Sequence, residues 1–237
     1  MKVSLKHFKI YNYAMSKDEI ANQYNVKGYR ENLALNKNVE ASSTAKNLLP
    51  SLVVDGDSST RWGSDYTNGV EKPEWLIIDL EDTYLINEIY ISWEAAYASG
   101  YTIQGSIDGN TYFDIKEITN GTGAQDVLTE LGDQEVRYVK FALTTQGRAD
   151  KKYGFSIWEI EIYENPNTQA KRIVSSALEE LQQYTRGYEK GNLPGDIYDE
   201  WKTIFEEYYA LADEGKLTEF QKVTIITDVS NKLDDIE

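Results

Sequence analysis

The spacing of hydrophobic and polar positions changes along the 237-residue chain. Between residues 32 and 165, short β-branched or aromatic runs alternate with turn residues, a pattern typical of β-strands. Asp108-Gly109 predicts a hairpin turn between two runs, and Gly121-Thr122-Gly123 predicts a loop. Because no helical spacing intervenes, the pattern favours a β-sandwich or barrel. The predicted strands are residues 76–80, 86–93, 101–107, 112–115, 136–143 and 156–163.

Helical spacing of apolar residues begins at Asn165-Pro166-Asn167. Three helical faces follow; the second is entered through Leu193-Pro194-Gly195 and ends at Gly215. The third begins at Thr218, where Gln221 completes a capping box. Amphipathic helices with short joints predict an antiparallel three-helix bundle. Its apolar positions are Ile173, Val174, Ala177, Leu178, Leu181, Tyr184, Ile197, Trp201, Ile204, Phe205, Tyr208, Leu211, Val223, Ile226, Leu233 and Ile236.

The first 31 residues differ from both regions. Residues 6–13 alternate like a strand, and Ser16 with Glu19 predicts a capped helical turn. A segment of about 30 residues cannot close a core of its own, so it is expected to dock elsewhere. The predicted domains are therefore residues 1–31, 32–165 and 166–237. No apolar run matches a signal peptide or a bilayer span, which indicates a cytosolic protein or an internal piece of a longer secreted one.

Composition excludes several kinds of function. The formal charge of -16 disfavours nucleic acid and anionic membrane surfaces as partners. The absence of cysteine and the single histidine, His7, argue against thiolate catalysis, His-dependent triads and multi-His metal sites. Neither a phosphate-binding glycine loop nor a G-x-S-x-G elbow occurs, so the residues give no positive reason to predict an enzyme.

The clearest chemical signal is the run Asp55-Gly56-Asp57-Ser58-Ser59-Thr60. Carboxylates and a hydroxyl on a tight loop are hard oxygen donors of the kind that calcium requires. The alternative, which the spacing alone favours, is a surface Asp-Gly turn with a Ser/Thr cap.

Aromatic and charged residues near predicted strand ends form a second signal. These residues are Trp93-Glu94-Ala95-Ala96-Tyr97, Arg148 and Tyr153-Gly154-Phe155. Planar hydrogen-bonding groups match the hydroxyls of a sugar, and aromatic faces match its apolar C–H patches. The alternative is that Trp93 and Phe155 fill the core while the charges are solvated; for Trp93 the core is favoured.

Several ordered motifs carry a family resemblance. They are Asn32-Leu33-Ala34, residues 54–62, residues 75–80, residues 106–109, Arg137-Tyr138-Val139 and residues 153–160. Over roughly residues 32–164 this set resembles the discoidin-like domain (coagulation factor V/VIII type C), and most of all the family 32 carbohydrate-binding modules of bacterial glycoside hydrolases. The resemblance implies an eight-stranded jelly-roll β-sandwich, separate from the C-terminal three-helix bundle.

The resemblance also implies one structural calcium ion. Side chains of Asp55, Thr60 and Glu159 would bind it, together with backbone carbonyls of Leu52, Asp57 and Trp158. For the sugar site, the resemblance implies Arg61, Glu94 and Tyr153, with Tyr66, Tyr97 and Arg148 as further candidates. The early loop lacks the histidine that many members carry, so a glucose- or glucosamine-type chain end is expected rather than galactose.

The flanking segments resemble parts of modular carbohydrate-active proteins. Residues 8–20 resemble the end of a concanavalin- or laminin-G-like domain, and the helices resemble three-helix spacer modules. The expected function is non-catalytic sugar binding within a larger secreted or cell-surface bacterial protein, whose other domains would be its partners and could include a glycoside hydrolase. Insertion into a membrane is not expected. The alternative is a discoidin-like adhesion module that binds a protein, with the bundle as spacer or docking element.

Overall fold

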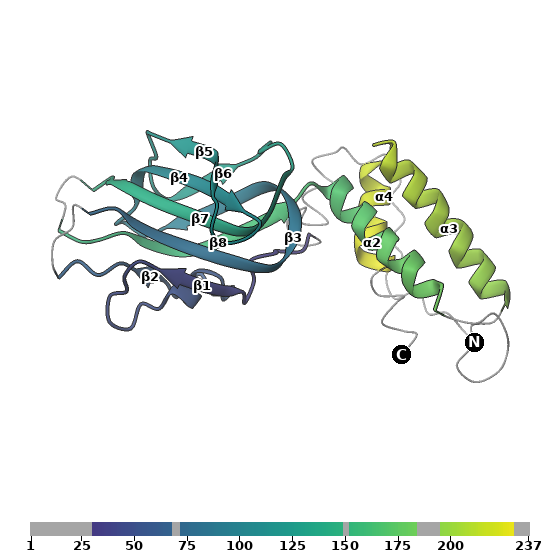
Figure 1. Ribbon diagram of the computed structural model, residues 1–237, viewed down its shortest axis with the longest axis horizontal. Helices are drawn as coiled ribbons and strands as arrows, with labels where there is room; N and C mark the ends of the chain where they lie inside the picture. The colour runs from purple at the N-terminus through teal and green to yellow at the C-terminus, as the bar shows by residue number, and fades with distance from the viewer. Residues whose placement is uncertain (1–29, 68–71, 149–151, 184–194, 230–237) are drawn as a thin grey trace, which may run out of the picture. The chain divides into compact units, whose positions relative to one another are not determined.

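The computed structural model describes residues 30–67, 72–148, 152–183 and 195–229 (Figure 1). The chain divides into two compact units, Met1–Glu31 and Asn32–Glu237. The strand and the helical turn expected before residue 21 lie outside the described residues. The elements are β1 (Asn38–Ala41), η1 (Pro50–Val53), β2 (Trp62–Gly63), β3 (Glu74–Trp93), β4 (Ala98–Ser106), β5 (Phe113–Ile118), β6 (Gln125–Leu128), β7 (Gln134–Gln146), β8 (Ser156–Glu164), α2 (Pro166–Leu181), α3 (Gly195–Asp213), α4 (Glu219–Thr224) and η2 (Ile225–Val229).

The eight described strands form an open antiparallel sandwich, which confirms the predicted fold class. The strand order is β2-β8-β3-β7-β4-β5, and both β1 and β6 also pair with β3. Residues 76–79 of β3 pair with β1 and residues 74–79 with β7, whereas the part from residue 86 onward pairs with β8 and β6; residues 84–86 pair with β7 again. A register shift between Asp79 and Tyr84 separates the two halves. One long strand therefore takes part in both layers.

This bend corrects one expectation, because residues 76–80 and 86–93 were predicted as two strands. Glu81 lies at the bend with a φ of 71°. Asp79 Oδ1 accepts a hydrogen bond from Glu81 N at 2.8 Å, which fixes the turn of the backbone there. The polar residues between the two apolar runs thus form a bulge within one strand rather than a loop between two.

Inward-facing residues of both layers build the core of the sandwich. Trp62, Ile78, Ile91 and Phe141 are fully buried, and alternation along β3 and β7 sends the intervening side chains outward. Leu33 is also buried, and its N–H donates to Ile162 O at 2.9 Å. This bond ties the start of the described chain to β8.

The helices begin where the sequence predicts. Asn165 caps α2 by accepting from Asn167 N, and the capping box of Thr218 and Gln221 is present at the start of α4. Gly215, after α3, has a φ of 65°, a left-handed value that glycine adopts readily. The π-helical turn η2 was not predicted. Among the described helices, none combines the length and the apolar character needed to cross a bilayer.

Candidate functional site

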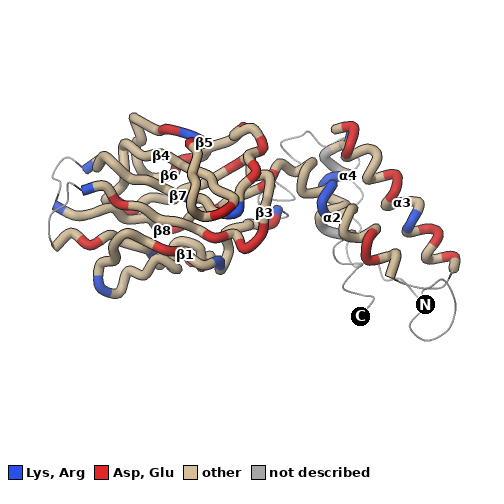
Figure 2. The backbone as a smooth tube through the Cα atoms, in the orientation of Figure 1, with Lys and Arg blue, Asp and Glu red and all other residues tan. Residues whose placement is uncertain are grey.

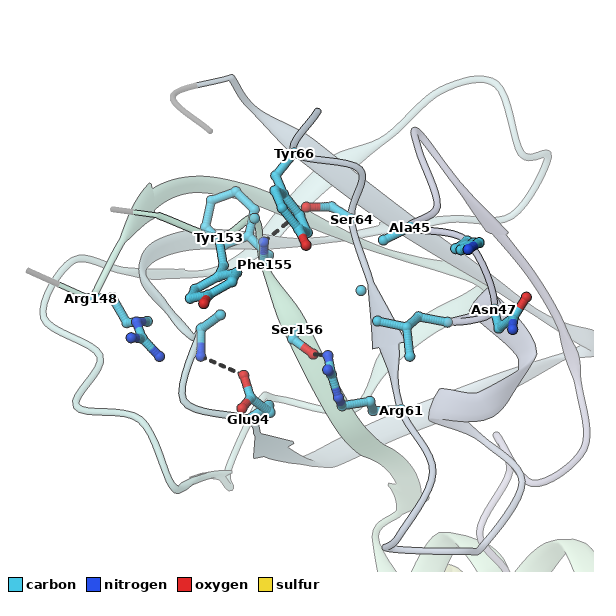
Figure 3. A pocket seen from close by; sticks show the side chains of 15 residues that line it. Ala45, Asn47, Arg61, Ser64, Tyr66, Glu94, Arg148, Tyr153, Phe155 and Ser156 are labelled. Atoms are coloured by element: carbon cyan, nitrogen blue, oxygen red, sulfur yellow. Dashed lines mark hydrogen bonds between the residues drawn. The ribbon is translucent and has the colours of Figure 1, made fainter. Parts of the chain in front are cut away.

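A pocket of about 600 Å³ lies among the loops at one end of the sandwich (Figure 3). Four chain segments meet there: residues 45–48, the stretch around β2, the residues after β3, and the residues before and at the start of β8. Five of the six predicted sugar-binding residues line it. The lining residues are Ala45, Lys46, Asn47, Leu48, Arg61, Gly63, Ser64, Tyr66, Glu94, Ala96, Arg148, Tyr153, Gly154, Phe155 and Ser156.

Backbone hydrogen bonds hold these segments together. Ser156 N donates to Ala96 O at 2.8 Å, and Glu94 N donates to Ser156 O at 3.2 Å. Ser64 N donates to Phe155 O at 2.9 Å, and Phe155 N donates in return to Ser64 Oγ at 2.9 Å. Gly154 permits this approach, because a Cβ there would collide with Ser64 Oγ and lie 3.0 Å from Ser64 O. The pocket floor is therefore a rigid, hydrogen-bonded surface.

Arg61 lies on this floor with its guanidinium fixed on two sides. Its Nη1 donates to Ser156 Oγ at 2.5 Å, and Ser156 Oγ donates in turn to Trp62 O at 2.8 Å. The guanidinium carbon lies 5.6 Å from the centre of the Trp158 ring, a cation–π distance. This arrangement presents the remaining N–H groups of Arg61 in a fixed orientation.

Glu94 follows the last residue of β3 and is half-buried. Its Oε2 accepts from Ala96 N at 2.9 Å, which holds the carboxylate at the pocket wall (Figure 3). Among the described residues Oε1 has no hydrogen-bond donor, so it can accept from the hydroxyl or amine of a ligand.

Two tyrosines form an exposed aromatic wall. Tyr66 and Tyr153 meet edge to face with ring centres 5.6 Å apart, and 42% and 46% of their surfaces are exposed. The guanidinium of Arg148 lies 5.1 Å from the centre of the Tyr153 ring. Gln146 Nε2 donates to Tyr153 O at 2.6 Å and fixes the backbone of this loop. An exposed ring held in this way offers a flat apolar face to a ligand.

The structure does not bring Tyr97 into this pocket. Tyr97 packs against the core and lies beside Gly123, and its O accepts from Gly147 N at 3.0 Å. Ala96, in the bend between β3 and β4, lines the pocket instead. Trp93 is buried, which confirms its assignment to the core.

Sequence reasoning missed the second half of the pocket wall. Lys46 and Asn47 belong to a turn with no strand or helix spacing, in which Leu48 N donates to Ala45 O at 2.9 Å. Ala45 N donates to Gly63 O at 2.8 Å, so the turn is joined to β2. The turn reaches the pocket only because it lies beside β2, and no local sequence pattern predicts its contact with β2.

The predicted calcium ligands converge on the loop between η1 and β2. Thr60 Oγ1 donates to Asp55 Oδ2 at 2.7 Å and lies 3.0 Å from Asp57 O. Glu159, which is 7% exposed, accepts from Gly56 N through Oε1 at 3.3 Å. Two carboxylates, a hydroxyl and a carbonyl oxygen thus meet, a donor set that fits calcium.

Hydrogen bonds within this loop orient Asp57. The Asp57 side chain accepts from Ser59 N and Oγ at 2.9 and 2.6 Å, and these bonds lower its carboxyl pKa. Its carbonyl oxygen is the part that faces Thr60. Leu52 lies in η1 and Trp158 precedes Glu159 in β8. Within the described part of the chain, no cluster of three or more His, Cys, Asp or Glu side chains is suited to a metal; the expected set instead relies on hydroxyl and carbonyl oxygens.

Comparison with known proteins gives consistent similarities. Residues 52–141 match the family described as NedA-like, galactose-binding domain. Chitosan-binding module 1 of a chitosanase/glucanase from Paenibacillus sp. IK-5 is 36% identical, with a TM-score of 0.51 over 56% of this chain and 98% of that one. Module 2 of the same enzyme, solved with chitotriose, is also 36% identical, with a TM-score of 0.51 over 56% of this chain and 99% of that one.

A longer curated protein is also similar. The polysaccharide lyase 8 family protein HylA of Enterococcus faecalis is 33% identical over 115 residues, which is 47% of this chain. The matched part spans only 8% of that relative's length.

Proposed function

Because the β-sandwich of this chain belongs to the F5/F8 type C family of galactose-binding-like domains, we propose that its pocket binds the end of a carbohydrate chain without catalysing a reaction. The observation that supports this proposal is the meeting of Arg61, Glu94 and Tyr153 around one pocket. These residues are far apart in the sequence, and each one presents a group suited to a sugar.

The three groups divide the recognition of a pyranose ring between them. Tyr153 stacks against the apolar C–H face, as aromatic rings do in sugar sites. Glu94 accepts hydrogen bonds from ring hydroxyls, or pairs with a protonated amine when the sugar carries one. Arg61 donates from its fixed position to a hydroxyl or ring oxygen of this unit, and its other N–H groups remain for the sugar unit that follows. The chitosan-binding modules that resemble this chain support a glucose- or glucosamine-type end as the ligand.

We expect weak affinity for a single site, with a Kd on the order of micromolar to millimolar. A few hydrogen bonds and one stacked ring leave little free energy after the ordering costs are subtracted. Neighbouring modules of the same protein would raise the effective affinity through avidity. The domain would in this way keep an attached glycan-active enzyme close to its polymer, outside the cell or at its surface, with the helices as a spacer.

Calcium would act structurally in this proposal. Asp55, Thr60 and Glu159 would bind it through side chains, and Leu52, Asp57 and Trp158 through carbonyl oxygens. The ion would supply a cross-link between the loop and β8. None of these residues lines the sugar pocket.

Titration calorimetry with mono- and disaccharides of glucose, glucosamine, N-acetylglucosamine and galactose tests the proposal. We expect saturable binding of glucose- or glucosamine-type sugars, weakened at least about tenfold by Glu94→Ala, since about 1.4 kcal/mol corresponds to a factor of ten. Glu117→Ala, on the exposed surface of β5, is the matched control and should bind like the parent protein. Absence of binding to any of these sugars would overturn the proposal.

A further inference from the structure

The charge of the pocket is opposite to that of the chain. The protein carries 40 Asp and Glu residues against 24 Lys and Arg. The pocket, in contrast, is lined by Lys46, Arg61 and Arg148 and by a single carboxylate, that of Glu94. Figure 2 shows acidic positions spread over strands and helices, while several basic ones gather among the loops at the left end of the sandwich. A local excess of positive charge on an acidic protein points to a ligand that is itself negative.

The charged groups are distributed along the pocket rather than clustered at one point. Glu94, Arg148 and the Tyr153 ring lie toward one side, Asn47 lies at the other, and Arg61 is between them (Figure 3). Lys46 immediately precedes Asn47 in the same turn. A volume of about 600 Å³ is within the range of drug-sized ligand sites, so the pocket has room for more than one sugar unit.

The turn that carries Lys46 is rigid. In addition to the bond from Leu48 N to Ala45 O within the turn, two bonds join it to Gly63. Leu48 O accepts from Gly63 N at 3.3 Å, and Ala45 N donates to Gly63 O. Lys46 has a φ of 40°, in the left-handed region that glycine or asparagine occupies more easily than lysine. A lysine at such a position places a cation at the pocket rim at a cost in backbone energy. Among the described residues Lys46 forms no ion pair that would neutralise it.

From this layout we infer that the natural ligand carries an anionic group, a carboxylate or a sulfate, on the sugar unit next to its terminus, and that Lys46 and Arg61 bind this group. The inference rests on the proposed function, since it names the ligand class of the same pocket. The terminal unit lies between Glu94 and Tyr153, where the carboxylate disfavours a second negative charge. The following unit then extends toward the turn at residues 45–48. There a guanidinium and an ammonium can each donate charge-assisted hydrogen bonds to the anionic oxygens.

The net charge of the protein makes the inference specific. A chain of charge -16 repels anions in general, so long-range electrostatics alone would make an acidic sugar bind more weakly than a neutral one. At an ionic strength of about 0.15 M the Debye length is about 8 Å, which screens distant carboxylates but not direct contacts in the pocket. A preference for an acidic sugar would therefore come from the pocket itself.

Three disaccharides with the same terminal N-acetylglucosamine test the inference by calorimetry or NMR titration. The second unit is glucose, glucuronate or O-sulfated glucose. We expect one or both anionic disaccharides to bind about tenfold more tightly than the neutral one, equivalent to about 1.4 kcal/mol. This advantage should shrink as the salt concentration rises toward about 1 M, where the Debye length falls to about 3 Å.

Charge variants then test the residues. Lys46→Gln should reduce the ratio of anionic to neutral affinity severalfold, whereas Lys116→Gln, which removes an exposed charge from β5, should leave the ratio unchanged. Melting curves show whether each variant is folded. If neutral and anionic disaccharides bind equally, or the neutral one binds better, the inference is wrong and the proposed function stands. If none of the three binds, the inference fails, and the proposed function fails with it only when the sugars of the first titration do not bind either. A ratio that Lys46→Gln leaves unchanged overturns the assignment of the anion to Lys46.

Discussion

Two aromatic residues near strand ends, Trp93 and Tyr153, have opposite environments. The Trp93 indole N–H donates to Asp126 Oδ2 at 2.8 Å, and the Tyr101 hydroxyl donates to the same oxygen at 2.7 Å. Burial and the neighbouring carboxylate raise the pKa of Tyr101, so this hydroxyl stays a donor. With its polar edge satisfied, Trp93 can fill the core. Tyr153 is instead exposed beside Tyr66 and Arg148, which leaves its ring available to a ligand.

Tyr153→Ala should weaken sugar binding by up to about tenfold, because contact with an aromatic face contributes about 0.5–1.5 kcal/mol. The melting temperature should change little, since the ring is largely outside the core. Tyr209→Ala is the control: this tyrosine of α3 is also exposed and also lies against a cation, Lys171, at 5.5 Å. Calorimetry measures both variants. Equal affinities for Tyr153→Ala and the parent would remove Tyr153 from the site.

Gly154→Ala should destabilise the protein by about 1–3 kcal/mol, because the added methyl collides with Ser64 Oγ and crowds Ser64 O. Ser64→Ala should cost about 1–3 kcal/mol as well, since Phe155 N loses its acceptor in a buried position. The double variant removes the collision with the hydroxyl, so its loss should be smaller than the sum of the two. Urea unfolding of all four proteins measures the difference, and strict additivity would contradict the predicted contact.

At the scale of elements, the long strand β3 determines how the layers connect. Its bulge lies beside a bidentate ion pair, in which Arg137 Nε and Nη2 of β7 donate to Asp79 Oδ1 and Oδ2 at 2.8 and 2.9 Å. Within the bulge, Glu81 accepts a hydrogen bond from Lys37 Nζ at 2.6 Å. These contacts hold the bend that lets β3 enter both layers.

Asp79→Asn should lower the melting temperature at neutral pH, and the difference from the parent should disappear in acid. Hydrogen bonds from Arg137 lower the pKa of Asp79 in the folded state. The stabilisation is therefore complete above the ordinary Asp pKa of about 3.9 and is lost as the pH falls through the lowered value. Thermal melts from neutral to acidic pH measure the effect. A difference that stays constant with pH would show that the charge of Asp79 is not responsible.

The elements differ in how far the sequence could predict them. The longer strands and all three helices follow clear spacing, and the hairpin between β4 and β5 follows its Asp108-Gly109 turn. Strands β1, β2 and β6 have two to four residues, too few to show a period, and only their pairing with long strands defines them. In the same way, Ala96 and Tyr97 lie at a bend between β3 and β4, where no period shows which of the two faces the pocket.

At the scale of the molecule, contacts between distant residues complete both sites. Glu159 reaches Gly56 across 103 positions, and Arg61 reaches Ser156 across 95. Periodicity describes neighbours a few residues apart and cannot predict such pairs. The family resemblance named Glu159 with the Asp55–Thr60 loop and Arg61 with Tyr153 as members of common sites, but not the hydrogen bonds that join these segments. The Lys46 turn belongs to none of these motifs and was not anticipated.

The closure between the Asp55–Thr60 loop and β8 leads to a prediction about calcium. Both carboxylates accept hydrogen bonds from this loop: Asp55 accepts from Thr60 Oγ1 and Asp57 N, and Glu159 accepts from Gly56 N. A divalent cation bound by both would offset their repulsion and would bind only the folded state. At about a hundredfold excess over its Kd, calcium should therefore stabilise folding by about 3 kcal/mol, and a chelator should reverse the rise in melting temperature.

Two aspartate variants separate this effect from general salt stabilisation. Asp55→Asn should abolish most of the calcium-dependent rise, because it removes a charged ligand. Asp108→Asn is the matched control: Asp108 also precedes a glycine in an exposed turn, where bonds from Thr111 N, Asn110 N and Ser106 lower its pKa, but it belongs to the loop between β4 and β5. This variant should keep the full calcium response. If neither calcium nor chelator changes the melting temperature, the calcium assignment is wrong. The loop would then be an Asp-Gly turn held by its own hydrogen bonds, and the sandwich would fold without a metal.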